Sequence, residues 1–182
     1  MEFFKKRRNA WFVTLLIIIL VTVVSAGSSL NKLRKQADNV FYNGEGMDGM
    51  GIQHDLDMIM SYCSNLTVVA SRYMDKEHDL VKAVNNNKDA LEAAETPDKK
   101  YQGAQNLFQS VTELYVYMGD LHLSEKDQDF HDSIYADIES RYIIISRSTY
   151  NQYAKEFNII RNRFPANILS AITSVPALEL YE

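Results

Sequence analysis

AWFVTLLIIILVTVVSA, residues 10–26, is a run of seventeen residues without a charge. As a helix rising about 1.5 Å per residue it is about 25 Å long, close to the roughly 30 Å hydrocarbon core of a bilayer. In water such a helix would expose leucine and isoleucine on every side, and Trp11 stands where an aromatic ring anchors at the headgroups. The run therefore predicts a transmembrane helix over residues 10–27, behind a basic flank of residues 1–9. The basic residues of the flank are Lys5, Lys6, Arg7 and Arg8.

The fate and the orientation of this segment are two further questions. Val24-Ser25-Ala26 before Gly27 offers the small residues that signal peptidase needs, but the apolar run is longer than the roughly 7–15 residues usual in a cleaved signal peptide. We expect a retained signal anchor, with cleavage as the alternative. The positive-inside rule favours a cytoplasmic N-terminus and an exported body, because the flank before the run has one more basic residue than the stretch after it, and also carries the terminal amine. The competing basic residues after the run are Lys32, Arg34 and Lys35.

The body of the protein, residues 28–182, is acidic and long enough for one ordinary domain. The first 27 residues hold four basic residues and one acidic residue, so the body has a net charge of −8 against −5 for the whole chain. An acidic body argues against nucleic acid as a partner, because phosphate recognition needs a clustered basic face. The single cysteine, Cys63, cannot form an internal disulfide.

The apolar residues of the body recur at helical spacing throughout. Steps of three or four run from Leu56 to Leu91 and loosen only near His78. A second series follows the expected N-cap Thr96, and a third follows the N-cap Ser124 and continues along one face to Phe164, before Pro165. No segment alternates at the period of two that a strand requires. The sequence predicts an all-α fold, in which the transmembrane helix continues through residues 28–43, a loop spans residues 44–51, and helices of about 40 residues form an elongated antiparallel bundle.

Residues with catalytic or metal-binding chemistry do not form a recognisable motif. Di-iron bundles use Glu-x-x-His twice, whereas this chain offers Asp75-x-x-His78 and Gln128-x-x-His131. Cys63 lies on an apolar stripe, where cysteine is normally a buried hydrophobe. We therefore expect no enzymatic activity, no metal and no cofactor. The alternative is a metal-dependent enzyme or sensor that uses His78, His131 and the acidic residues around them.

An aromatic residue followed by asparagine or proline recurs every seven residues near the end of the chain. The pairs are Tyr150-Asn151, Phe157-Asn158 and Phe164-Pro165. Seven residues are about two helical turns, so the three aromatic residues share a face and the asparagines lie beside them. Aromatic residues at this spacing are usually core, and buried asparagines can fix register. The pattern predicts a structural clamp that closes the bundle, with a partner-docking surface as the alternative.

These pairs resemble the C-terminal signature of the LemA family, which consists of Arg-x-x-Tyr-Asn, an aromatic-Asn pair and Phe-Pro-x-Asn. The N-terminal span agrees with that family, and the resemblance extends over essentially the whole chain. The region from His54 to Leu66 lacks the arginine pair and the proline of the family's middle motif, so the chain is identified as a divergent member. The residues that match the signature are Arg147, Tyr150, Asn151, Phe157, Asn158, Phe164, Pro165 and Asn167.

The LemA resemblance implies a membrane-anchored helical protein with no established reaction. Together with the missing catalytic motifs, it leads us to expect a non-enzymatic bundle that acts as a scaffold or interaction module at the bacterial envelope. Its expected partners are the lipid bilayer and either an unidentified envelope protein or a second copy of the chain.

Overall fold

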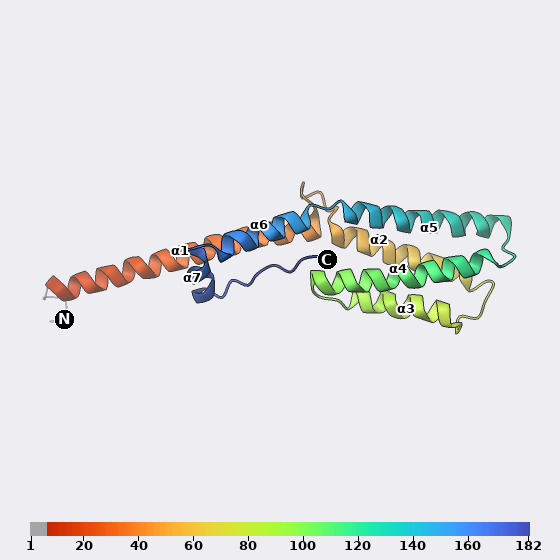
Figure 1. The fold of residues 1–182 in the computed structure, drawn as a ribbon, viewed down its shortest axis with the longest axis horizontal. Coiled ribbons are helices and arrows are strands. Elements are labelled where there is room, and N and C mark those ends of the chain that lie inside the picture. The colour runs from red at the N-terminus through yellow and green to blue at the C-terminus, as the bar shows by residue number, and fades with distance from the viewer. Residues whose placement is uncertain (1–6) are drawn as a thin grey trace. The chain divides into compact units, whose positions relative to one another are not determined.

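The computed structural model describes residues 7–182, and this part of the chain forms seven α-helices and no β-strand. The prediction of an all-α fold is confirmed. The chain divides into two compact units. The first contains the described part of residues 1–38 together with residues 152–178, and the second contains residues 39–151 together with residues 179–182 (Figure 1).

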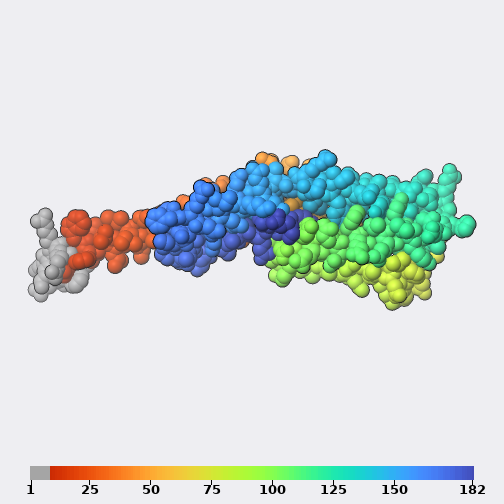
Figure 2. Space-filling view, in the orientation of Figure 1, coloured from red at the N-terminus to blue at the C-terminus, as the bar shows by residue number. Residues whose placement is uncertain are grey.

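Helix α1 (Arg7–Asn43) is uninterrupted, as predicted for a membrane helix that continues beyond residue 27. It is long and apolar enough to cross a membrane. Its large apolar side chains from Trp11 to Val24 are mostly exposed, whereas Gly27, Leu30 and Ala37 are buried. In the first unit, residues 152–178 cover this second part of α1 and leave the first part bare (Figure 2).

Two further helices, α6 (Tyr150–Asn162) and α7 (Ala166–Ile172), supply that cover. Phe157 of α6 is 3% exposed, and it lines a groove together with Leu33 and Ala37 of α1. The methyl carbon of Thr173, directly after α7, lies 2.4 Å from the position that a Cβ atom would take at Gly27. The missing side chain of Gly27 therefore lets the end of α7 lie directly against α1.

The second unit is a four-helix bundle built from α2 (Ile52–Ala70), α3 (Asp79–Glu92), α4 (Pro97–Gly119) and α5 (Glu125–Ser146). Short turns join successive helices, which run antiparallel (Figure 1). Ser124 caps α5 as predicted, because its side chain accepts a hydrogen bond from the backbone N–H of Asp127. The fully buried core side chains include Leu56, Ile59, Cys63, Leu66, Val84, Leu107, Val111, Leu114 and Ile138.

The helices of this bundle are shorter than the predicted rods of about 40 residues, because two breaks interrupt them. Between α2 and α3, a carboxylate oxygen of Asp75 accepts a hydrogen bond from the backbone N–H of Glu77 at 2.9 Å. The His78 ring then accepts one from the backbone N–H of Leu80 and caps α3. Such local bonds compete with helix continuation. The apolar spacing loosens near His78 and resumes after the turn, so the sequence marked a weak point in the predicted helix but not its end.

The second break lies between α5 and α6, where the predicted helix was continuous to Phe164. The hydroxyl oxygen of Ser148 accepts a hydrogen bond from the backbone N–H of Tyr150 at 3.3 Å, so α6 begins anew at Tyr150. Within the loop that joins α1 to α2, Gly44 and Gly49 adopt φ values of 73° and 82°, which glycine tolerates best. This loop occupies the residues predicted for it.

Candidate functional site

The start of α6 binds the end of the C-terminal tail. Tyr150 is fully buried, and its hydroxyl donates a hydrogen bond of 2.6 Å to the carbonyl oxygen of Glu179. The Asn151 amide donates to the carbonyl oxygen of Tyr181 and accepts from the backbone N–H of the same residue, both at 2.8 Å. One side chain thus satisfies both backbone groups of a tail residue, as a neighbouring strand would do.

The same arrangement recurs seven residues later on α6, within the first unit. The Asn158 amide donates to the carbonyl oxygen of Leu178 and accepts from its backbone N–H, both at 2.9 Å. One turn further on, the Nε atom of Arg161 donates to the carbonyl oxygen of Val175 at 2.9 Å. We call the hydrogen bonds made by Asn151 and Asn158 to the tail the amide ladder.

The tail contributes apolar side chains as well as backbone groups. Val175, Leu178 and Tyr181 recur every three residues and are 5%, 5% and 9% exposed. The Tyr181 ring meets Tyr101 edge-on with ring centroids 5.3 Å apart, and it lies 6.0 Å from the ring of Phe41. Sequence reasoning missed these residues. The three-residue spacing after the last helix was the only signal for them.

The remaining residues of the predicted site lie outside this arrangement. Arg147 follows α5 and is exposed, as are Pro165, directly before α7, and Asn167 within α7. Phe164 is 80% exposed and lies beyond the end of α6, so the prediction that its ring shares a buried face with Tyr150 and Phe157 is wrong. Proline disfavours helical backbone in the residue before it, so the helix ends before Phe164. Outside a helix, a seven-residue spacing does not place two side chains on the same face.

The predicted membrane flank is described only in part. Lys5 and Lys6 lie outside the described residues. Helix α1 begins at Arg7 and includes Arg8, and the side chain of Trp11 is 70% exposed.

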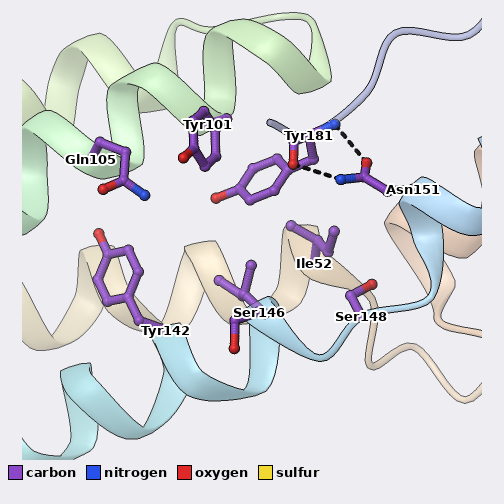
Figure 3. Close-up of a pocket in the computed structure, with 9 residues that line it drawn as sticks. Ile52, Tyr101, Gln105, Tyr142, Ser146, Ser148, Asn151 and Tyr181 are labelled. Atoms are coloured by element: carbon purple, nitrogen blue, oxygen red, sulfur yellow. Dashed lines mark hydrogen bonds between the residues drawn. The ribbon is translucent and has the colours of Figure 1, made fainter.

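A pocket of about 140 Å³ lies beside Tyr181 in the second unit. Tyr101 and Gln105 from α4, Tyr142 from α5 and Tyr181 from the tail surround it (Figure 3). The Tyr142 hydroxyl donates a hydrogen bond of 2.6 Å to the carbonyl oxygen of Ala104. Burial raises the pKa of both Tyr142 and Tyr181, so both phenols stay protonated at neutral pH.

The chemistry of this pocket is that of neutral hydrogen-bonding groups. Its described lining holds hydroxyl and amide groups together with Ile52 and Ile145, and it includes no carboxylate, imidazole or thiol. General acid–base catalysis near neutral pH mostly uses such ionisable groups. The pocket is therefore suited to holding water or a small neutral molecule beside the tail.

Two polar clusters stand apart from the tail, in the second unit. Asp127 accepts a hydrogen bond of 2.6 Å from the Tyr73 hydroxyl and pairs with Arg72. These interactions, chiefly the hydrogen bond from Tyr73, lower the pKa of Asp127. His131 is buried, stacks on Tyr115 with ring centroids 4.2 Å apart, and lies 2.8 Å from an oxygen of Asp132. Across residues 7–182 no three histidine, cysteine, aspartate or glutamate side chains lie close enough together to hold a metal ion.

These features define an all-helical protein whose C-terminal tail is bound along one helix and whose first helix is long and apolar enough to cross a membrane. The LemA family model matches residues 50–182, and the chain belongs to the LemA family. The match begins after α1 and includes both asparagines of the amide ladder as well as the tail. No curated protein matches the chain.

Proposed function

We propose that this protein is a non-enzymatic helical bundle, anchored in the membrane by α1, that acts as a scaffold or interaction module at the bacterial envelope. The observation that supports the anchoring is the change in burial along α1. Trp11, Leu16 and Leu20 are 70%, 64% and 58% exposed, whereas cover begins at Gly27. Burying one such leucine contributes about 1.5–3 kcal/mol, so a bilayer stabilises this part of α1 strongly.

Extraction of membranes from cells that express the full chain tests the anchor. The wild-type protein should stay with the membrane pellet at alkaline pH. Replacing Ile17 and Ile18 together with lysine should release it, because each central lysine costs about 2.5–3.5 kcal/mol on insertion. Ile143→Lys is the matched control, since Ile143 is 50% exposed on α5 of the second unit. Extraction of the wild-type protein at alkaline pH would contradict the proposal.

The proposed orientation places the N-terminus in the cytoplasm and exports the body. The basic residues of the N-terminal flank support this orientation, against three basic residues that follow the apolar run. A reporter that is active only outside the cytoplasm, fused after Glu182, should be active. An inactive reporter beside an active cytoplasmic one would reverse the orientation. The intact mass of the purified protein distinguishes a retained anchor from cleavage after Ala26.

The proposed role as an interaction module requires a partner or self-association. Exposed apolar side chains in the second unit, among them Val68, Val116 and Phe130, support such a role, at 57%, 61% and 43% exposure. Chemical cross-linking in intact cells, followed by purification in detergent, should yield a reproducible adduct. Recovery of the monomer alone under cross-linking conditions would count against this part of the proposal.

A further inference from the structure

Three large apolar side chains at and before α7 are exposed in the first unit. Phe164 is 80% exposed, Ile168 51% and Ile172 61%. They are spaced four residues apart, and the two isoleucines therefore share one face of α7. Single exposed apolar residues are ordinary, but three on one short segment expose apolar area that water does not stabilise. We call these three residues the α7 apolar surface.

The α7 apolar surface belongs to the segment that meets α1 where its bare apolar part ends. Thr173, which follows α7, contacts α1 at Gly27, the residue directly after the seventeen-residue uncharged run. Val24 is still 62% exposed, while Leu30 is 5% exposed. If α1 spans the bilayer, α7 therefore lies at the depth of the lipid headgroups, beside the point where α1 emerges.

The charge of the surrounding sequence matches an anionic lipid surface. Residues 27–37 of α1 and residues 157–178 contain five basic residues and no acidic residue, in a chain whose net charge is −5. Along the helix axis, Lys32 stands about 9 Å and Lys35 about 14 Å beyond the end of the apolar run, so Lys32 lies within about one Debye length of it. The five basic residues are Lys32, Arg34, Lys35, Arg161 and Arg163.

We propose that α7 lies on the anionic surface of the bilayer, with Phe164, Ile168 and Ile172 inserted at the boundary between headgroups and acyl chains. Interfacial helices bind membranes in this way, through an apolar face flanked by basic residues. This inference rests on the proposed anchoring by α1. It adds a second attachment to the membrane, contributed by a segment far from α1 along the chain.

Tryptophan fluorescence of the full chain in lipid nanodiscs tests both attachments separately, because Trp11 is the only tryptophan. The wild-type protein reports on α1. The variant Trp11→Phe/Phe164→Trp moves the single tryptophan to the α7 apolar surface. The variant Trp11→Phe/Phe130→Trp is the matched control, because Phe130 is 43% exposed but stands between the acidic Asp129 and Asp132. The lipids are phosphatidylcholine and phosphatidylglycerol, brominated near the headgroup end of the acyl chains.

The brominated lipids should quench the Phe164→Trp variant to an extent comparable to the wild type. Its emission should lie at shorter wavelength than that of the Phe130→Trp control, which should not be quenched. Quenching of the wild type without quenching of the Phe164→Trp variant would overturn this inference and leave the anchor intact, whereas failure to quench Trp11 would overturn the anchor. Shifted but unquenched emission from the Phe164→Trp variant would mean that protein, such as a second copy, covers the ring, and it would also overturn the inference.

The Ile172→Trp variant in the same Trp11→Phe background repeats the measurement at a second position of the α7 apolar surface. It should behave as the Phe164→Trp variant does, because Ile172 is also more than half exposed. Omitting phosphatidylglycerol should reduce the quenching of both α7 variants and leave that of Trp11 in the wild type unchanged. Equal quenching in both lipid compositions would overturn the role assigned to the basic residues.

Discussion

Replacing Asn151 with alanine should release the end of the C-terminal tail without unfolding the bundle. The substitution removes both hydrogen bonds to Tyr181, each 2.8 Å long. At about 1 kcal/mol for each bond, the loss is about 2 kcal/mol. The gain in helix propensity from asparagine to alanine offsets only about half a kcal/mol of it. The remaining loss, about 1.5 kcal/mol, corresponds to a roughly 10-fold increase in the open population of the tail.

Hydrogen exchange of the full chain in detergent, read by mass spectrometry on peptides that cover residues 175–182, measures this opening directly. The tail of Asn151→Ala should exchange about 10-fold faster than that of the wild type. Peptides from α2 and α5 should be unchanged. Gln152→Ala is the matched control, because Gln152 is exposed on the same helix and its amide donates to Glu156 rather than to the tail.

An isosteric variant separates the hydrogen bonds from the loss of side-chain volume. Asn151→Asp keeps an acceptor for the Tyr181 N–H but turns a carboxylate oxygen toward the Tyr181 carbonyl, where the amide donor was. Its tail should exchange faster than that of the alanine variant. Tail exchange in both variants that equals that of Gln152→Ala would refute the role of the amide ladder.

Three further predictions concern single positions. Gly27→Ala should loosen α7 by about 1–3 kcal/mol, because the new Cβ would lie 2.4 Å from a carbon of Thr173; unchanged hydrogen exchange over α7 would contradict this. Hydrogen bonds, chiefly the one from Tyr73, lower the pKa of Asp127 in the folded protein. The ionised form of Asp127 therefore stabilises the fold above the unfolded-state pKa, and this stability is lost as the pH falls through the lower folded-state pKa. Asp127→Asn should therefore lose less stability than the wild type on acidification, as followed by denaturant unfolding, and equal losses would disprove it. Burial raises the pKa of the Cys63 thiol to about 12, so iodoacetamide should label it only after unfolding, and rapid labelling of the native protein would count against this burial.

Elements that extend over many residues could be predicted from the sequence. The apolar run and the residues after it are one helix, and the glycine-rich loop and the Ser124 cap occur where local chemistry favours them. The breaks at residues 71–78 and 147–149 could not be predicted in the same way. Each depends on a few local hydrogen bonds, such as that of Ser148, which leave the apolar spacing nearly in phase on both sides.

Only the residues that α6 contributes to the site could be predicted from the sequence. The asparagines of the amide ladder were identified from their spacing, but their partners were not. Leu178 and Tyr181 belong to a segment outside any helix or strand, whose only pattern is an apolar residue at every third position. Its backbone groups are satisfied by side chains far away in the sequence. Phe164 shows the opposite case. It follows the seven-residue spacing of Tyr150 and Phe157, but α6 ends at Asn162, so the spacing does not place its ring on their face.

The amide ladder also determines which solution conditions the tail attachment responds to. Asparagine has no ionisable group, so the bonds made by Asn151 and Asn158 have no charge for salt to screen and no proton to exchange as the pH changes. The pair of Arg72 and Asp127 in the second unit, by contrast, weakens with both high salt and acid. An attachment built from neutral amides keeps its strength at a charged surface, where counterions and protons accumulate.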